Sequence, residues 1–237
     1  MSIAQNVHKI LADIRSAAIA AGRDPQQITL CAATKMNGSD AVRQAIQAGI
    51  TCCGENRVQE LTQKLSENAY DGAEIHFIGH LQTNKVKQVV GKVSLIQSVD
   101  SLRLLQAISK EAQRQNLVQD ILLEINIGQE ESKSGFEQEE IIPLLENLQQ
   151  YPHVRVRGLM AIPPVCENPG DNNEFFAKIR NLSVDITAKK YDNVCMEILS
   201  MGMSDDYMDA IAHGSTMIRI GTAIFGARNY APTHPQG

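Results

Sequence analysis

Lys35 follows a short apolar run and is the first residue whose setting could support covalent chemistry. The run, residues 28–33 (ITLCAA), is typical of a strand buried on both faces. Burial lowers the pKa of a lysine because it disfavours the ammonium form, and a neutral amine can form a Schiff base with a carbonyl compound. On this stretch alone, a lysine that extends its amine to the solvent rim is the commoner alternative.

Serine and glycine residues near the end of the chain form a pattern that suits an anion. Residues 200–204 (SMGMS) follow one predicted strand, and Gly221 and Thr222 follow the last one. Glycine lets backbone N–H groups approach an anion, and hydroxyls and a helix N-terminus add favourable donors. Serine and glycine are also ordinary turn and cap residues, so each piece alone is weak evidence. Together they predict a phosphate cup, with Asp205 and Asp206 pointing to solvent as acids of a first helical turn.

A Schiff-base lysine and a phosphate cup together predict a ligand that carries both an aldehyde and a phosphate. Pyridoxal 5′-phosphate is such a ligand, with its aldehyde on Lys35 and its phosphate in the cup. An aldolase-like enzyme that acts on a sugar phosphate would use the same two features. The residues alone leave both alternatives open.

Eight short apolar segments alternate with helical segments along the chain. The predicted strands are residues 28–33, 50–53, 75–78, 95–99, 121–127, 154–160, 194–199 and 217–220. Apolar residues at helical spacing predict one helix before the first strand and one after each of the first seven, including a short helix over 86–93. This alternation predicts a closed, parallel (β/α)8 barrel, with a doubly wound open sheet as the alternative.

The predicted barrel brings the polar candidates to one end. In such barrels the active face is formed by the carboxyl ends of the strands. The residues expected there are Lys35, Asn56, His80, Ser200, Ser204, Gly221 and Thr222.

Composition restricts the partners and the compartment. The chain has 237 residues, 43% of them hydrophobic, which is enough for one core. A net charge of −5 disfavours a nucleic-acid binder, no apolar run approaches the roughly 20 residues of a membrane span, and no signal peptide opens the chain. The five cysteines are odd in number and lack CxxC spacing, which predicts neither a disulfide framework nor a zinc knuckle and favours a reducing cytosol. Adjacent Cys52 and Cys53 are interpreted as small core residues.

Six motifs carry a resemblance to a known family. They are GENRVQE at 54–60, HFIGHLQTNK at 76–85, SKSGF at 132–136, GLMAIPP at 158–164, LSMGMSDD at 199–206 and RIGTAIFG at 219–226. In this order they resemble the pyridoxal-phosphate homeostasis protein family, also called YggS-like. That family's fold resembles the barrel domain of alanine racemase, the type III fold of pyridoxal-phosphate proteins. The resemblance implies pyridoxal 5′-phosphate as the cofactor.

The resemblance also implies a role for each matching residue. Lys35 matches the lysine that holds the cofactor as an internal aldimine, and Arg219 matches the arginine that faces the pyridine nitrogen. Ser204, with Gly221 and Thr222, matches the phosphate cup.

Other positions match with less defined roles. Ser200 matches a position near the cup, and Asn56 and Met160 match residues of the pocket wall. His80 is expected either to contact the cofactor or to bond to backbone, and Lys133 is either a rim lysine that meets anions or a plain surface lysine. The family usually has Ser before the lysine and Pro soon after it, whereas this chain has Thr34 and no such Pro, which leaves the shape of that loop open.

The resemblance implies a carrier more than an enzyme. An arginine can only donate, so a ring nitrogen opposite Arg219 stays unprotonated and the ring is a weaker electron sink. In alanine racemase and related decarboxylases a second β-domain supplies a catalytic residue, and this sequence leaves little room for one after Gly226. We therefore expect a single domain, 1–237, with the barrel over about 28–226 and a short tail, 227–237.

The expected function is that of a monomeric, cytosolic protein that serves vitamin B6 and amino-acid homeostasis as a reservoir, carrier or regulator. Its expected partners are pyridoxal 5′-phosphate and either dependent apoenzymes or regulatory proteins, without nucleic acid, membrane or metal. Three alternatives stay open. They are a racemase or decarboxylase of the same fold type, a sugar-phosphate enzyme, and regulation through protein contacts that the cofactor controls.

Overall fold

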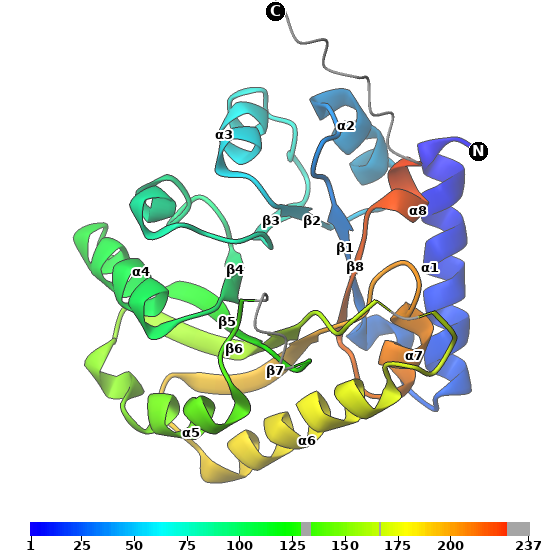
Figure 1. Ribbon diagram of the computed structural model, residues 1–237. Coiled ribbons are helices and arrows are strands. Elements are labelled where there is room, and N and C mark those ends of the chain that lie inside the picture. Colours follow the sequence, from blue (N-terminus) through cyan, green and yellow to red (C-terminus); the bar gives the residue numbers. More distant parts are fainter. Residues whose placement is uncertain (129–133, 166, 227–237) are drawn as a thin grey trace, which may run out of the picture.

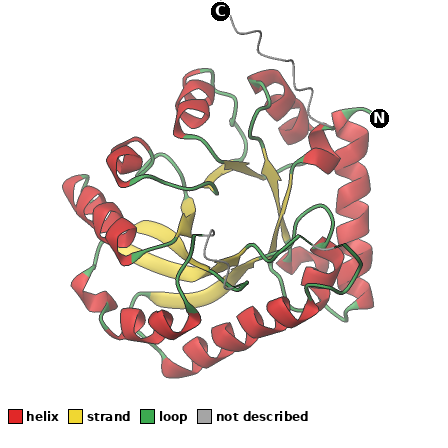
Figure 2. Ribbon diagram, in the orientation of Figure 1, coloured by secondary structure: helices red, strands yellow, loops and turns green. Residues whose placement is uncertain are grey.

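Eight parallel strands close into a barrel in the order of the sequence (Figures 1 and 2). The computed structural model describes residues 1–128, 134–165 and 167–226. The strands are β1 Thr29–Ala33, β2 Cys52–Glu55, β3 Glu74–Phe77, β4 Leu95–Val99, β5 Gln119–Ile125, β6 Val154–Ala161, β7 Val194–Ser200 and β8 Met217–Ile220. Because β8 pairs with β1, the sheet has no open edge. The predicted (β/α)8 barrel is confirmed, and the open doubly wound sheet is excluded.

Helices surround the barrel, and Figure 2 shows them outside the strands on every side. The α-helices of the described residues are α1 Ile3–Ala20, α2 Ser39–Gln47, α3 Val58–Ser66, α4 Leu102–Arg114, α5 Gln138–Glu146, α6 Asn173–Lys189, α7 Tyr207–Ala212 and α8 Thr222–Phe225. The 3-10 helices are η1 Pro25–Gln27, η2 Thr83–Gln88 and η3 Leu148–Gln150. None of the helices described is long and apolar enough to cross a membrane.

The predicted N-terminal helix is α1, which precedes the barrel and packs against α2, α7 and α8 (Figure 1). Ser2 and Gln5 form a capping box at its start. Its buried face is Val7, Ile10, Ile14 and Ala18, at helical spacing. This helix therefore covers the side of the barrel where β8 meets β1.

Three details differ from the predictions. The segment over 86–93 does not form an α-helix, because the 3-10 helix η2 ends at Gln88. The valines of this segment are β-branched and would lose side-chain freedom in an α-helix. Helix α8 was missed because four residues are too few to show periodicity. The second strand, predicted over 50–53, begins at Cys52 and runs on through Gly54 and Glu55, because both pair with β3. A Cβ on Gly54 would lie 2.8 Å from the sulfur of Cys31, so this glycine belongs to the crowded barrel interior.

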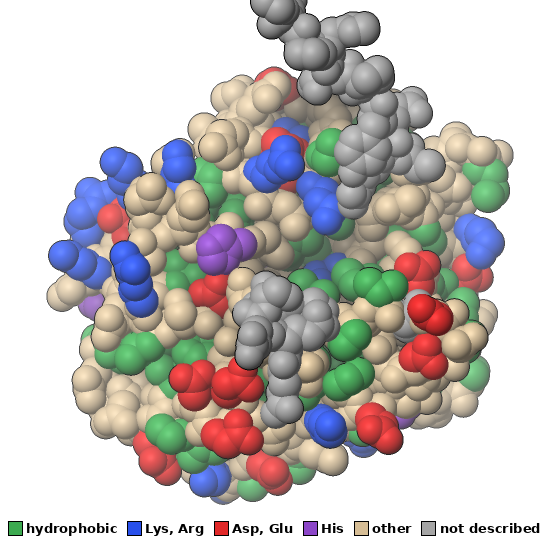
Figure 3. Space-filling view, viewed as in Figure 1, with side chains coloured by type: hydrophobic (Ala, Val, Ile, Leu, Met, Phe, Trp, Pro, Cys, Tyr) green, Lys and Arg blue, Asp and Glu red, His purple; other side chains and the backbone are tan. Residues whose placement is uncertain are grey.

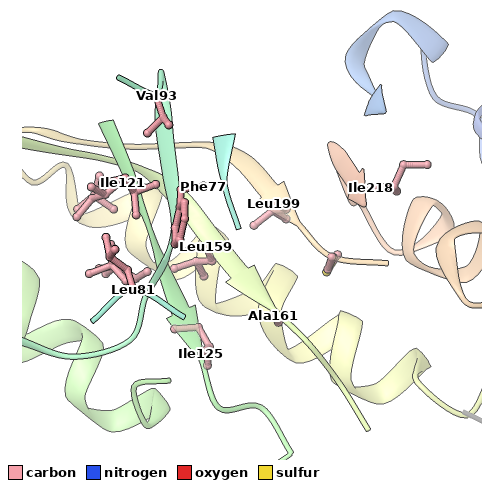
Figure 4. Close-up of a cluster of buried hydrophobic side chains, with 14 of the residues drawn as sticks. Phe77, Leu81, Val93, Ile121, Ile125, Leu159, Ala161, Leu199 and Ile218 are labelled. Atoms are coloured by element: carbon pink, nitrogen blue, oxygen red, sulfur yellow. The ribbon is translucent and has the colours of Figure 1, made fainter. Parts of the chain in front are cut away.

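Alternate residues of each strand face two different cores. The large outer core lies between strands and helices, and Figure 4 shows part of it, with Phe77, Ile121 and Leu199 among the labelled side chains. Two smaller clusters come from the alternate strand positions. Their buried members are Cys31, Ala33, Cys52, Ile78 and Met217 in one and Leu95, Leu122 and Met160 in the other. These inner clusters fill the barrel, so it is a packed core rather than a channel.

Candidate functional site

The strand register brings Lys35, Asn56 and Gly221 to one end of the barrel. Ala33 of β1 pairs with Gly54 of β2, and Lys35 and Asn56 follow that pair at the same spacing. A Cβ on Gly221 would lie only 3.2 Å from the carbonyl oxygen of Ala33, so the ends of β1 and β8 are in close contact. Figure 3 shows the surface of this end, which is hollowed over the centre of the barrel.

Lys35 lies in the turn between β1 and α2 and is half-buried. The next residue, Met36, has φ of 61°, a left-handed conformation that non-glycine residues rarely adopt. Two hydrogen bonds hold the turn: Met36 N–H donates to Glu60 Oε2 at 2.6 Å, and Asn37 Nδ2 donates to the Lys35 carbonyl at 3.0 Å. This is the loop whose shape the sequence left open. It is fixed by a left-handed residue and side-chain contacts instead of a proline.

A buried polar cluster lies directly beneath the Lys35 turn. Glu55 Oε2 accepts hydrogen bonds from Thr34 Oγ1 at 3.0 Å, Lys64 Nζ at 2.6 Å and Tyr70 OH at 3.2 Å. Lys64 Nζ also donates to the Thr34 carbonyl at 2.8 Å. Burial raises the pKa of Tyr70, and the nearby Glu55 carboxylate adds to that effect. The sequence analysis missed this cluster. The available signal was Lys64 three residues after Leu61, on the apolar face of a predicted helix.

Arg219 begins a chain of hydrogen bonds across the barrel interior. Its Nη1 donates to Ser200 Oγ at 2.6 Å, and its Nη2 donates to the Ala161 carbonyl at 2.9 Å. Ser200 Oγ then donates to Gln97 Oε1 at 2.6 Å, which leaves Gln97 Nε2 to donate to His76 Nδ1 at 2.9 Å. The Gln97 amide oxygen can only accept and its amide nitrogen can only donate, so in this amide orientation Ser200 donates to Gln97 and His76 Nδ1 accepts from it. We call these residues the interior relay.

Ser200, which the resemblance matches to a position near the phosphate cup, is part of the interior relay. Its side chain is fully buried, and its hydroxyl proton is directed to Gln97. Its lone pair accepts from Arg219, which is 5% exposed. Burial lowers the pKa of the Arg219 guanidinium. Ser200 therefore positions Arg219, and is not a free donor at the surface of the site.

Glu124 lies on β5 near Arg219, and the sequence analysis did not select it. Burial raises the pKa of this carboxyl to about 7, the charge of Asp100 adds to the rise, and Arg219 opposes it. Met160 pairs in register with both Glu124 and Ser200 on the neighbouring strands. Met160 is 1% exposed and packs in an inner cluster, so it lies in the barrel interior below this end.

The loop after β7 carries Ser204 and is held by Asp206. One oxygen of Asp206 accepts from the Met203 N–H at 2.7 Å, and the other accepts from Asn172 Nδ2 at 2.8 Å. Asp206 is 6% exposed, so the expectation that it points to solvent is wrong, whereas Asp205 is exposed. The carboxylate is turned inward because it caps the N–H of its own loop. Both of its oxygens thus have partners close to this loop.

The remaining candidates lie around this end with different exposures. Ser204 is half-buried and Thr222 is exposed at the start of α8. Asn56 Oδ1 is buried and has no hydrogen-bond partner among the described residues. His80 is 62% exposed, and its Nδ1 lies 3.0 Å from Asp100 Oδ2, so a carboxylate and not backbone is its partner. Lys133 lies outside the described residues.

Comparisons with known proteins extend over nearly the whole chain. A family model described as "Alanine racemase, N-terminal domain" matches residues 7–229. A pyridoxal phosphate homeostasis protein of Aquifex aeolicus is 43% identical over 97% of this chain and 100% of its own. A protein of the same name from Pseudomonas aeruginosa is 41% identical over 97% of each chain.

A solved structure agrees with these relatives. PipY of Synechococcus elongatus, solved with PLP bound, superimposes with a TM-score of 0.81 at 31% identity, over 95% of this chain and 100% of that one. The resemblance seen in the six sequence motifs is thereby confirmed. This chain belongs to the pyridoxal phosphate homeostasis proteins, within the family of the alanine racemase N-terminal domain.

Proposed function

We propose that this protein binds pyridoxal 5′-phosphate on Lys35 and serves vitamin B6 and amino-acid homeostasis as a reservoir or carrier. One observation carries the proposal: Lys35 directly follows β1, Arg219 lies on the neighbouring strand β8, and both are near the same end of the barrel. Cys31 of β1 pairs with Arg219 of β8, so the backbone of Lys35 lies further toward the carboxyl ends of the strands than that of Arg219. A lysine amine and a buried guanidinium at one end of the barrel suit a ligand with an aldehyde and an aromatic nitrogen.

The residues present fit this ligand. Arginine has five N–H donors. In Arg219, Nη1 donates to the Ser200 hydroxyl and Nη2 donates to the Ala161 carbonyl. The buried Asn56 Oδ1 without a partner is an acceptor available to a ligand. We assign the phosphate to Ser204, Gly221 and Thr222, where a hydroxyl and backbone N–H groups can donate.

Each of these residues has a separate task. The bound cofactor supplies a reactive aldehyde on a nitrogen-containing ring. Arg219 donates to the ring nitrogen and keeps a proton off it, because a guanidinium cannot accept. The relay through Ser200 keeps the guanidinium in place. The cluster of Glu55, Lys64 and Thr34 holds the turn that carries Lys35.

The proposal includes a non-catalytic role and a monomer of one domain in the cytosol. The relatives are named for homeostasis and not for a reaction. The described cysteines are free thiols, which agrees with a reducing compartment. Transfer of the cofactor to dependent apoenzymes or regulatory proteins is the partner interaction that this role requires.

The test is visible absorbance of the purified protein before and after borohydride, with peptide mapping of the reduced adduct. We expect a yellow protein whose adduct maps to Lys35. Lys35→Ala and Lys35→Arg should both lose the adduct, since neither has a primary amine, whereas Lys85→Ala should keep it. An adduct that persists in Lys35→Arg would refute the assignment. A protein that stays colourless with added pyridoxal 5′-phosphate would instead favour a sugar-phosphate ligand.

The raised pKa of Glu124 supports a second candidate function. This function is proton exchange on amino acids by a racemase-like enzyme. A carboxyl with a pKa of about 7 near Arg219 is suited to move a proton at neutral pH. Incubation of amino acids with the loaded protein in deuterium oxide distinguishes the two functions. Deuterium incorporation at the α-carbon that is lost in Glu124→Gln would establish the enzyme. Its absence in the wild-type protein would leave the carrier.

A further inference from the structure

Cys31, Cys52 and His76 meet inside the barrel, deeper than the residues assigned to the cofactor. Cys31 and Cys52 are register partners on β1 and β2, and both are buried. Cys52 Sγ lies 3.3 Å from His76 Nδ1, and the three residues can each offer an atom within 4.8 Å of the other two. Two sulfurs and an imidazole nitrogen form a ligand set that zinc uses in proteins. Because the three residues lie on three different strands, their spacing in the sequence shows no CxxC motif that would indicate a metal site.

The separation of Cys52 and His76 suits one shared ion. Zinc bonds of about 2.3 Å to sulfur and about 2.0–2.1 Å to nitrogen put tetrahedral S and N ligands about 3.5 Å apart. The observed separation of Cys52 Sγ and His76 Nδ1 is 3.3 Å. The two ligand atoms therefore need only a small adjustment to share one ion.

The interior relay presents His76 in the tautomer that a metal needs. Arg219 donates to Ser200, Ser200 donates to Gln97 Oε1 because that oxygen can only accept, and Gln97 Nε2 donates to His76 Nδ1. His76 Nδ1 is therefore an acceptor with a lone pair, and its proton is on Nε2. The same Nδ1 lies 3.3 Å from Cys52 Sγ. A metal ion would take the lone pair of Nδ1 in place of the Gln97 N–H, which also contacts the sulfur of Met217 at 3.0 Å.

Glu74 supplies the outer partner that zinc-binding histidines use. Its Oε2 lies 3.5 Å from His76 Nε2, on the opposite side of the ring from Cys52. Metal-bound histidines commonly donate their other N–H to a carboxylate, which fixes the ring and raises its basicity. The Glu74 side chain is 71% exposed, whereas that of His76 is 4% exposed. The pair therefore connects the buried site to solvent.

An entry path leads to His76 from the amino-terminal end of the barrel. A cavity of about 310 Å³ lies there, lined by Glu74, His76 and Met217 among others. Its other acidic residues, Asp120 and Glu197, both pair with Arg157. Glu74 is thus the carboxylate of this cavity that faces the histidine. A cation can enter here without passing the end that carries Lys35.

We propose that Cys31, Cys52 and His76 form a binding site for one Zn²⁺, entered from the amino-terminal end of the barrel. Binding converts the two thiols to thiolates and releases two protons to solvent. Water from the cavity supplies the fourth ligand, as in zinc sites with three protein ligands. Glu74 orients His76 from outside the ligand set. The sequence analysis expected no metal, because it considered only the spacing of cysteines along the chain.

The experiment is equilibrium dialysis of the full-length, phosphine-reduced protein against Zn²⁺, with bound metal measured by elemental analysis. We expect one ion per chain. Cys31→Ser and Cys52→Ser should each weaken zinc binding by about 100-fold or more, and Glu74→Gln by about 10- to 100-fold. Cys53→Ala and Cys195→Ser are matched controls that should bind as the wild-type protein does. Cys53 packs in the outer core, and Cys195 is only partly buried.

Cobalt supplies a second readout that does not depend on activity. Co²⁺ bound to thiolates gives charge-transfer absorption, recorded as a difference against the zinc-loaded protein so that cofactor absorption cancels. We expect this absorption in the wild-type protein and its loss in the Cys31→Ser/Cys52→Ser double variant. A wild-type protein that retains no zinc, or a double variant that binds zinc as tightly as wild type, overturns the proposal. Thermal unfolding of each variant confirms that it is folded.

Discussion

Lys64 Nζ lies 2.6 Å from Glu55 Oε2 in the layer between β2 and α3, where neither side chain is exposed by more than 5%. This ion pair supports the turn that carries Lys35, because Lys64 also donates to the Thr34 carbonyl. A buried ion pair stabilises the fold only when both charged partners are present. Loss of one partner leaves the other charge buried without compensation.

Lys64→Met is therefore expected to lower the free energy of unfolding by about 3–5 kcal/mol. Urea unfolding measures the effect. The matched control is Lys9→Met, which removes an ion pair with Asp13 in which the lysine is 62% exposed. Pairs of that kind contribute about 0–1 kcal/mol. Equal losses in the two variants would show that burial of the Glu55 pair has no energetic consequence.

Gly79→Ala is expected to destabilise the protein and displace Asn56. A Cβ at Gly79 would lie 2.2 Å from the carbonyl oxygen of Asn56 and 2.6 Å from its Cα, and backbone cannot move aside cheaply. We expect a loss of about 1–3 kcal/mol in stability, with weaker cofactor binding. Gly38→Ala is the control, because no atom lies within 4 Å of its added Cβ. Similar thermal stability of both variants would contradict the close approach of the loops after β2 and β3.

Ser204→Ala tests the phosphate assignment. Removal of one hydrogen bond to a charged group should weaken pyridoxal 5′-phosphate binding by about 1.5–3 kcal/mol, or roughly 10- to 100-fold. Fluorescence or absorbance titration of cofactor-free protein gives the dissociation constant. Ser94→Ala serves as the control, since Ser94 bonds to the Ile75 carbonyl near the opposite end of the barrel. An unchanged constant in Ser204→Ala would remove this residue from the cup.

Glu124 should make stability depend on pH in the acid range. Its pKa rises from 4.5 to about 7 in the folded protein, so between these values the folded chain holds a proton that the unfolded chain has lost. The free energy of unfolding contributed by Glu124 is therefore full below pH 4.5 and is lost as the pH rises toward 7. The loss is on the order of 1–3 kcal/mol.

Glu124→Gln should remove this pH dependence, because its amide does not titrate. Urea unfolding of both proteins at the two ends of that range measures it. Glu139→Gln, at an exposed position in the first turn of α5, should leave the wild-type slope intact. If Glu124→Gln kept the wild-type slope, another group would be responsible.

The local pattern of apolar residues was sufficient to predict most of the strands and helices of the barrel. Strand β1 was predicted because its apolar run is continuous, and α1 because its apolar residues repeat at helical spacing, and both properties belong to neighbouring residues. The ends of the strands then indicated where Lys35, Asn56 and Gly221 would gather. Strand β2 was placed too early because Gly54 looks like a turn residue until its pairing partners are known.

The sequence by itself determined the order of strands and helices, the end of the barrel that carries the polar residues, and the family. Only the tertiary structure decided which side chains share the interior. The bonds from Arg219 through Ser200 and Gln97 to His76 join four strands, and Cys31 meets Cys52 by register. The physical reason is that periodicity reports one strand at a time, whereas contacts inside a barrel depend on register and closure, which are set by the pairing of all eight strands.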